Sequence, residues 1–197
     1  MKASSRVIFN TGILYIKLII VTILGLITIR LVLAALGETD FGIYSLVAGV
    51  VGLLAILQSA MTNASMRFMA HSLGSGDEIL ISETFNTTLF LHFIIGLFVV
   101  VFMELGGLLM FEYLLNIPDG KLFDAKIVFH FMVITAFVTI IAVPYDAVIN
   151  AHENMLALSI VDILGAFLKL GIGILLTFLS TNLLIIYGGL ILAVNII

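Results

Sequence analysis

Cysteine and tryptophan are both absent from this chain of 197 residues, and charged residues make up only 10% of it. Without cysteine, the chain forms neither a disulfide nor a thiolate metal site. Without tryptophan, an aromatic belt at a membrane surface depends on tyrosine, of which there are five. The formal net charge of −4 argues against a nucleic-acid partner, because such proteins carry basic patches.

Apolar side chains dominate what is present: 62% of the residues are hydrophobic and the mean hydropathy is +1.32. Soluble domains are about 45–50% apolar and about 25% charged. A chain of this length cannot hide so much apolar surface from water, so lipid is the expected solvent. No inserted soluble domain is predicted, and residues 1–197 are expected to form one transmembrane unit.

Six apolar segments predict membrane helices, and a helical span needs about 20 residues. The segments are 8–36, 41–70, 84–109, 125–151, 156–179 and 183–197. The short connections between them predict antiparallel neighbours, and therefore an all-α, polytopic transmembrane helix bundle of about six spans. Because the sixth segment is short and ends without a polar cap, we expect the sequence to be incomplete at its C-terminus.

Glycine is frequent inside these segments, and small residues let membrane helices approach closely. Close helix packing is therefore the expected role for most of Gly25, Gly49, Gly52, Gly96, Gly106, Gly107, Gly165, Gly171 and Gly173. Lys2 and Arg6 favour a cytoplasmic N-terminus, although Lys121 and Lys126 near the third connection argue the other way.

Six ionisable residues interrupt the apolar segments, and each would cost about 2.5–3.5 kcal/mol at a helix centre facing lipid. They are Lys17, Arg30, Glu104, Asp146, Asp162 and Lys169. We expect them to face the bundle interior or a hydrated cavity; snorkelling and structural ion pairing are the alternatives. Asp162 and Lys169 share a helix face but lie about 10 Å apart along it, so each is expected to find another partner.

Polar side chains follow one face of the second segment. Ser59, Asn63 and Arg67 recur at every fourth residue, while the other side of the helix is apolar. This pattern is typical of a helix that lines a polar cavity, and hydrogen bonding to a neighbouring helix is the alternative.

Pro144 lies two residues before Asp146, late in the fourth segment. A proline removes one backbone hydrogen bond and kinks a helix, and transporters often place ion sites at such breaks. A bend that serves only packing is the alternative.

Motifs for catalysis are missing. The sequence contains no phosphate-binding G-x-x-x-x-G-K-[ST], no G-x-S-x-G and no H-E-x-x-H. The four histidines are scattered, without the spacing of a metal site. The protein is therefore expected not to be an enzyme and to hold neither a metal nor an organic cofactor.

Three stretches carry a family resemblance. Residues 6–12 (RVIFNTG), 36–44 (LGETDFGIY) and 143–153 (VPYDAVINAHE) resemble a bacterial lipopolysaccharide or polysaccharide biosynthesis membrane protein. That family is the Wzx-like flippase branch of the multidrug/oligosaccharidyl-lipid/polysaccharide exporter superfamily. Its members have two six-helix lobes around a central cavity, and this chain resembles the N-terminal lobe.

The resemblance implies a flippase that moves an undecaprenyl-pyrophosphate-linked oligosaccharide between the leaflets of the bacterial inner membrane. The partners it implies are this lipid-linked oligosaccharide, membrane lipids and polysaccharide-assembly proteins. Cations suit the anionic pyrophosphate, and arginine binds phosphate through two parallel hydrogen bonds. The candidate substrate-cavity residues are Lys17, Arg30, Ser59, Asn63, Arg67 and Lys169.

Glu104, Asp146 and Asp162 are the candidates for coupling transport to H⁺ or Na⁺. The alternative is that these carboxylates only neutralise the cations. Two other functions remain open. One is a cation-coupled antiporter of drugs or other small molecules from the same superfamily, and the other is a membrane fragment that does not transport.

Overall fold

The computed structural model describes residues 3–196, and the side chains of 8–118 and 120–196 within them; all regular secondary structure in this part of the chain is helical. Six α-helices are joined through one π-helical turn, η1, and one 3-10 turn, η2. The elements are α1 (Ala3–Gly52), α2 (Leu54–Ser75), α3 (Glu78–Leu109), η1 (Met110–Leu114), η2 (Asp119–Lys121), α4 (Leu122–Ala151), α5 (Met155–Leu176) and α6 (Leu183–Ile196). The prediction of an all-α bundle is confirmed.

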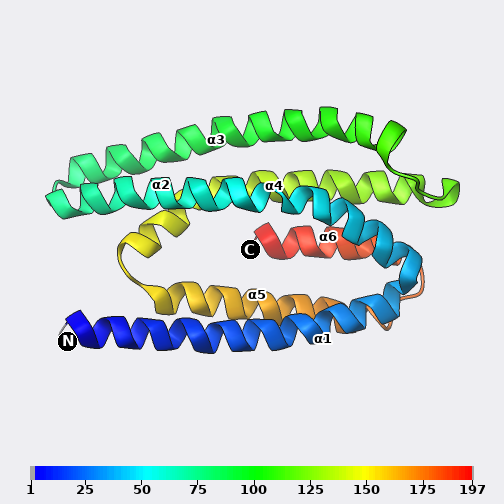
Figure 1. The fold of residues 1–197 in the computed structure, drawn as a ribbon, viewed down its shortest axis with the longest axis horizontal. Helices are drawn as coiled ribbons and strands as arrows, with labels where there is room; N and C mark the ends of the chain where they lie inside the picture. Colours follow the sequence, from blue (N-terminus) through cyan, green and yellow to red (C-terminus); the bar gives the residue numbers. More distant parts are fainter. Residues whose placement is uncertain (1–2, 197) are drawn as a thin grey trace.

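Four helical stretches are long and apolar enough to cross a membrane: Ile8–Ser75, Glu78–Leu114, Leu122–Ala151 and Met155–Leu176. The first holds two of the predicted spans. Its 68 residues would extend about 100 Å as a straight helix, more than three times the thickness of a bilayer core. Figure 1 shows how the length is accommodated: α1 runs along the bundle and then turns back toward α2.

The reversal occurs at Gly37, whose backbone leaves the helical region with φ 76° and ψ 171°. The prediction of a four-residue turn over 37–40 is wrong in extent, because the chain is helical again immediately after Gly37. Asp40 lies in that new helix, and its carboxylate is 2.8 Å from Lys121 Nζ. This ion pair ties the start of the second span to the start of α4.

We predict that Gly37→Ala lowers the free energy of unfolding by about 1–3 kcal/mol, because this backbone conformation is essentially restricted to glycine. A Cβ at Gly37 would contact nothing within 4 Å, so the cost is backbone strain alone. Gly42→Ala is the control: it is equally open but helical, and is expected to be neutral or stabilising. Unfolding by sodium dodecyl sulfate in mixed micelles measures both. Equal effects of the two substitutions would contradict the prediction.

The other predicted boundaries need correction. The second span bends where α1 ends at Gly52 and α2 begins at Leu54, although a continuous helix was predicted. The connection predicted over 71–83 is almost entirely helical: Gly76 ends α2 with φ 70°, and the Asp77 carboxylate accepts hydrogen bonds from the first amides of α3. Half of the connection predicted over 110–124 is helical turn, and α5 ends at Leu176 instead of 179.

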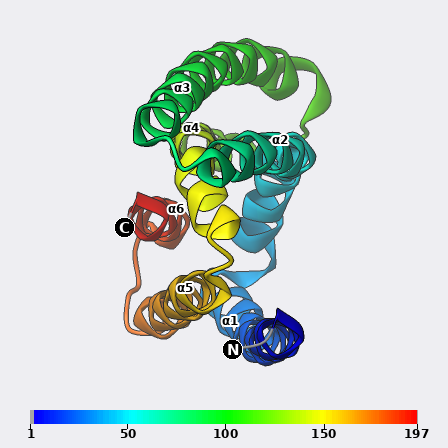
Figure 2. The same ribbon diagram turned by 90° about the vertical axis from the view of Figure 1, so that its left-hand side faces the viewer.

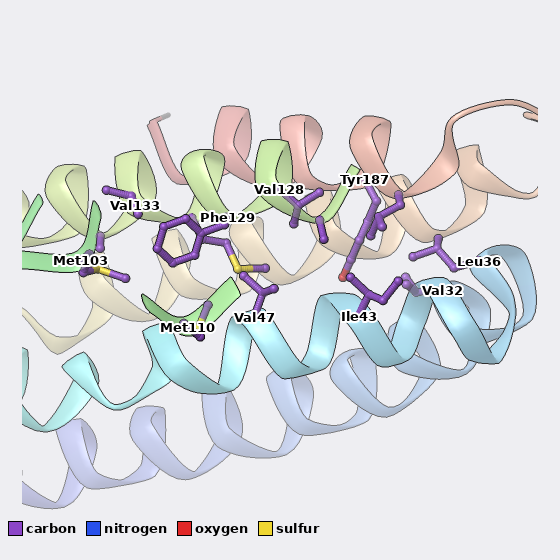
Figure 3. Packing of buried hydrophobic residues seen from close by; sticks show 14 of the residues in the cluster. Val32, Leu36, Ile43, Val47, Met103, Met110, Val128, Phe129, Val133 and Tyr187 are labelled. Carbon is purple, nitrogen blue, oxygen red and sulfur yellow. The ribbon is translucent and has the colours of Figure 1, made fainter. Parts of the chain in front are cut away.

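The hydrophobic core surrounds α4, which contributes more buried residues than any other helix. Figure 3 shows Val128 of α4 and Val47 of α1 pointing into the same space, while Tyr187 reaches from α6 toward Ile43. In Figure 2, α5 and the first half of α1 form a pair set apart from α2, α3 and α4. The interface between α1 and α5 is the most extensive of the fold, whereas α4 touches α5 only slightly.

The packing role predicted for the glycines holds for only three of them. A Cβ would meet a neighbouring helix at Gly96, Gly107 and Gly173. Within the described residues it would meet nothing within 4 Å at Gly25, Gly49, Gly52, Gly106, Gly165 and Gly171. The prediction is therefore wrong for most of these glycines. The helices touch along narrow stripes, and most of the glycines lie outside them.

Candidate functional site

Three charged residues from three helices gather inside the predicted membrane region. Lys17 Nζ of α1 lies 2.8 Å from Asp162 Oδ2 of α5. Asp146 of α4 is partly buried and close enough to Asp162 for their charges to interact. Lys17 pairs with Asp162 alone, and the Asp146 carboxylate forms no ion pair with another described residue. The expectation that Asp162 has a partner on another helix is confirmed.

We predict that the Lys17–Asp162 pair is coupled by about 1–2 kcal/mol, because each partner alone would leave a charge in the membrane. Lys17→Met and Asp162→Leu should each destabilise the protein, and the double variant should recover part of the loss. A double-mutant cycle of unfolding free energies in mixed micelles measures the coupling. Strictly additive single effects would contradict the pair.

The three other cations among the candidate substrate-cavity residues have no such partner among the described residues. Arg30, Arg67 and Lys169 are exposed, and among the described residues none of them forms an ion pair or a side-chain hydrogen bond. Arg30 lies two residues from the buried Thr28 and two from the buried Val32, and therefore on the opposite face of α1 from the interface with α5. The structure does not bring these cations together into one enclosed pocket.

The predicted polar stripe of α2 also faces away from the bundle. The packed face of α2 carries Ser65 and Met69, and Arg67 lies midway between them in sequence, on the other side of the helix. Ser59 and Asn63 are likewise exposed. Interhelical hydrogen bonding, the alternative for this stripe, applies instead to Ser65, whose Oγ lies 3.4 Å from His92 Nε2 on α3.

Glu104 has a partner that sequence reasoning missed. Its Oε1 accepts a hydrogen bond from His130 Nδ1 at 2.9 Å, which links α3 to α4. The spacing of the histidines does not reveal this contact, because it joins residues 26 positions apart. A polar residue at similar depth in each of two adjacent predicted spans was the available signal. The sequence predicts that the six charges face a common interior or hydrated cavity. The structure contradicts this prediction, because the charges fall into separate groups.

Pro144 is fully buried, and α4 continues as one helix from Leu122 through Pro144 to Ala151. Figure 1 shows the last turns of α4 descending toward α5. The Asp146 carbonyl accepts a hydrogen bond of 2.8 Å from the Asn150 side chain.

A pocket of about 270 Å³ lies between the second span, α4 and α6. Its walls are mainly apolar, with Gln58, Thr135 and Thr139 as polar groups and Tyr44 at one side. The Tyr44 and Tyr187 rings contact one another beside it in a tilted arrangement, with centroids 4.6 Å apart and planes inclined at 55°. Sequence reasoning missed the two threonines, although their spacing of four places them on one face of α4.

The fold defines a multi-pass membrane protein whose spans carry charged and polar residues, and comparison with known families agrees. The family model described as MatE matches residues 14–179 of the chain. The protein therefore belongs to the MatE family, whose members are membrane transporters. No curated protein matches the sequence, and no solved structure matches it. Among the residues that the structure describes, no group of side chains is arranged to hold a metal ion.

Proposed function

We propose that the protein is a flippase for an anionic, lipid-linked oligosaccharide in the synthesis of a surface polysaccharide or lipopolysaccharide. The observation that carries the proposal is the unequal pairing of charges within the spans. Asp162 lies 2.8 Å from the ammonium group of Lys17, and Glu104 lies 2.9 Å from the ring of His130. Among the described residues, the side chains of Arg30, Arg67 and Lys169 have no ion-pair or hydrogen-bond partner. An unpaired cation on an exposed face is suited to a substrate that brings its own phosphates.

Ser59 and Asn63 extend the same face of α2 beside Arg67, and their side chains form no hydrogen bond to other described residues. Hydroxyl and amide groups of this kind suit sugar hydroxyls, which both donate and accept hydrogen bonds. Arginine would hold the pyrophosphate, and the neighbouring polar groups would hold the first sugars.

The Lys17–Asp162–Asp146 cluster supplies a place for coupling. Lys17 neutralises Asp162, so the Asp146 carboxylate, which has no ion pair among the described residues, is left as the group that H⁺ or Na⁺ would bind. The same carboxylate favours the second candidate, a cation-coupled antiporter of small molecules. The two functions differ in the charge of the cargo, and experiment distinguishes them on that basis.

We further propose that the N-terminus is cytoplasmic and that the protein resides in the inner membrane of a bacterium. Lys2 and Arg6 precede the first span, and Arg67 lies toward the end of the second, which returns to the same side. Polysaccharide-assembly proteins would then meet the flippase at its periplasmic end.

Complementation tests the function. The gene's full product, expressed in a bacterium that lacks its own polysaccharide flippase, should restore surface polysaccharide. In proteoliposomes it should move a lipid-linked oligosaccharide between leaflets and leave a cationic dye untransported. Dye transport without oligosaccharide movement would overturn the flippase proposal and support the antiporter.

Since the chain contains no cysteine, single-cysteine variants at Arg30 and Arg67 probe the proposed cavity directly. Both should react with a membrane-impermeant, water-soluble maleimide. A cysteine at Phe98, which is exposed on α3, is the lipid-facing control and should stay unreactive. Complete protection at both arginine positions would contradict the cavity.

A further inference from the structure

The outer groove between α3 and α4 holds two adjoining pockets that the proposed transport does not use. The first, of about 370 Å³, lies toward η1 and is lined by the ionisable residues Glu104, Glu112, Lys126 and His130. The second, of about 420 Å³, continues along the groove and is lined by Leu97, Val100, Val133, Ile134 and Phe137. Glu104 and His130 border both pockets. The groove is therefore polar at one end and apolar along the rest.

The position of this groove in the membrane follows from its surroundings. Leu105 and Leu108 of α3 are exposed beside it, as is Phe102 one turn before. Tyr113 is exposed in η1, at the end of α3, where an interfacial tyrosine is expected. The polar pocket thus lies within about two helical turns of the membrane surface, and the apolar pocket points toward the membrane interior.

Charged side chains facing lipid at this depth are costly unless a polar partner satisfies them. Glu104 and His130 partly satisfy one another through their hydrogen bond of 2.9 Å, although 40% and 56% of their side chains remain exposed. Glu112 and Lys126 are exposed, and among the described residues neither has an ion-pair partner. One free carboxylate and one free ammonium group therefore line a single pocket.

We propose that this groove binds a zwitterionic aminophospholipid of the surrounding membrane. The lipid's ammonium group would meet the carboxylates of Glu112 and Glu104 and the ring of Phe111. Its phosphate would meet Lys126, with His130 as a second donor when protonated. An acyl chain would occupy the adjoining apolar pocket. A ligand with two opposite charges and a long apolar chain matches all parts of the groove.

Binding is measured by native mass spectrometry of the detergent-solubilised protein with short-chain phosphatidylethanolamine as the probe. Phosphatidylglycerol lacks the ammonium group, phosphatidylcholine lacks its N–H donors, and water-soluble phosphoethanolamine lacks the chains. We expect phosphatidylethanolamine to bind at least tenfold more tightly than each of the three. Equal binding of phosphatidylglycerol would overturn the proposed recognition of the headgroup. Equal binding of phosphoethanolamine would overturn the membrane lipid as the source.

Two size-conserving variants, Glu112→Gln and Lys126→Gln, should each weaken phosphatidylethanolamine binding about tenfold, because each removes a charge-assisted hydrogen bond. Glu38→Gln is the matched control: it is an exposed carboxylate outside the groove and should leave binding unchanged. Unchanged binding in both groove variants would overturn the site.

The apolar half is tested separately, without touching a charge. Leu97→Trp should fill the apolar pocket and weaken lipid binding about tenfold, whereas Leu91→Trp, exposed elsewhere on α3, should not. Equal effects of the two tryptophans would overturn the assignment of the chain to this groove. These measurements are independent of transport, so they stand whether the cargo proves to be an oligosaccharide or a small cation.

Discussion

The proposed oligosaccharide flipping is expected to fall by about 100-fold or more when Arg30 and Arg67 are both replaced by glutamine. A hydrogen bond to a charged group contributes about 1.5–3 kcal/mol, and every 1.4 kcal/mol corresponds to a tenfold change. Losing one such bond from each arginine therefore costs at least about two powers of ten. Stability should change little, because both side chains are exposed and pair with no other described residue. The initial rate of flipping in proteoliposomes measures the loss.

Arg→Lys variants at the same two positions separate charge from geometry. Lysine keeps the charge but offers a point donor in place of the planar fork, so an intermediate rate is expected. Glu38→Gln controls for a change of surface charge and should flip at the unaltered rate. If the double glutamine variant is abundant, monodisperse and fully active, these arginines do not contact the cargo.

The overall architecture could be predicted because it depends on composition and segment length. An apolar segment of about 20 residues forms a helix in lipid regardless of its neighbours, since no water is there to satisfy the backbone. The reversal at Gly37 could be placed for the same reason, because glycine and polar residues interrupt the apolar run. The break between Gly52 and Leu54 is harder to place, because Gly52 is its only marker there and no proline or polar residue accompanies it.

The predicted helix boundaries are wrong where a helix continues beyond its apolar segment. Residues 71–75, with the exception of Leu73, are polar or small, yet they remain helical because Gly76 caps α2 and Asp77 caps α3. Hydropathy measures where lipid ends, whereas capping residues determine where a helix ends. Hydropathy and capping mark nearly the same residue at the start of α5. This helix begins at Met155, and the side chain of the preceding Asn154 accepts a hydrogen bond from the Ala157 amide.

Charged residues could be found from the sequence, but their grouping could not. The pairing of Lys17 with Asp162 and of Glu104 with His130 depends on which helices adjoin, and six short-looped helices allow several arrangements. The stripe of Ser59, Asn63 and Arg67 could be predicted because it lies on one helix. Which way that stripe faces is decided by Ser65 and Met69 packing inward on α2.

Gly107→Leu is expected to lower the free energy of unfolding by about 3 kcal/mol, because the site has no room for a side chain. A Cβ there would lie 2.5 Å from Cε1 and 2.6 Å from Cζ of Phe129. The Phe129 ring cannot withdraw easily, since the residue is 3% exposed and its edge contacts Phe111 at a centroid distance of 5.6 Å. Unfolding by sodium dodecyl sulfate in mixed micelles measures the change.

Gly106→Leu provides the matched control one residue earlier. A Cβ at Gly106 meets nothing within 4 Å, so the added side chain should cost less than about 0.5 kcal/mol. Adding Phe129→Ala to Gly107→Leu should recover part of the loss, because the smaller residue makes space for the leucine. Equal stability of the two glycine variants would show that α3 and α4 do not meet at Gly107, and would remove the shared wall of the groove in which Glu104 and His130 lie.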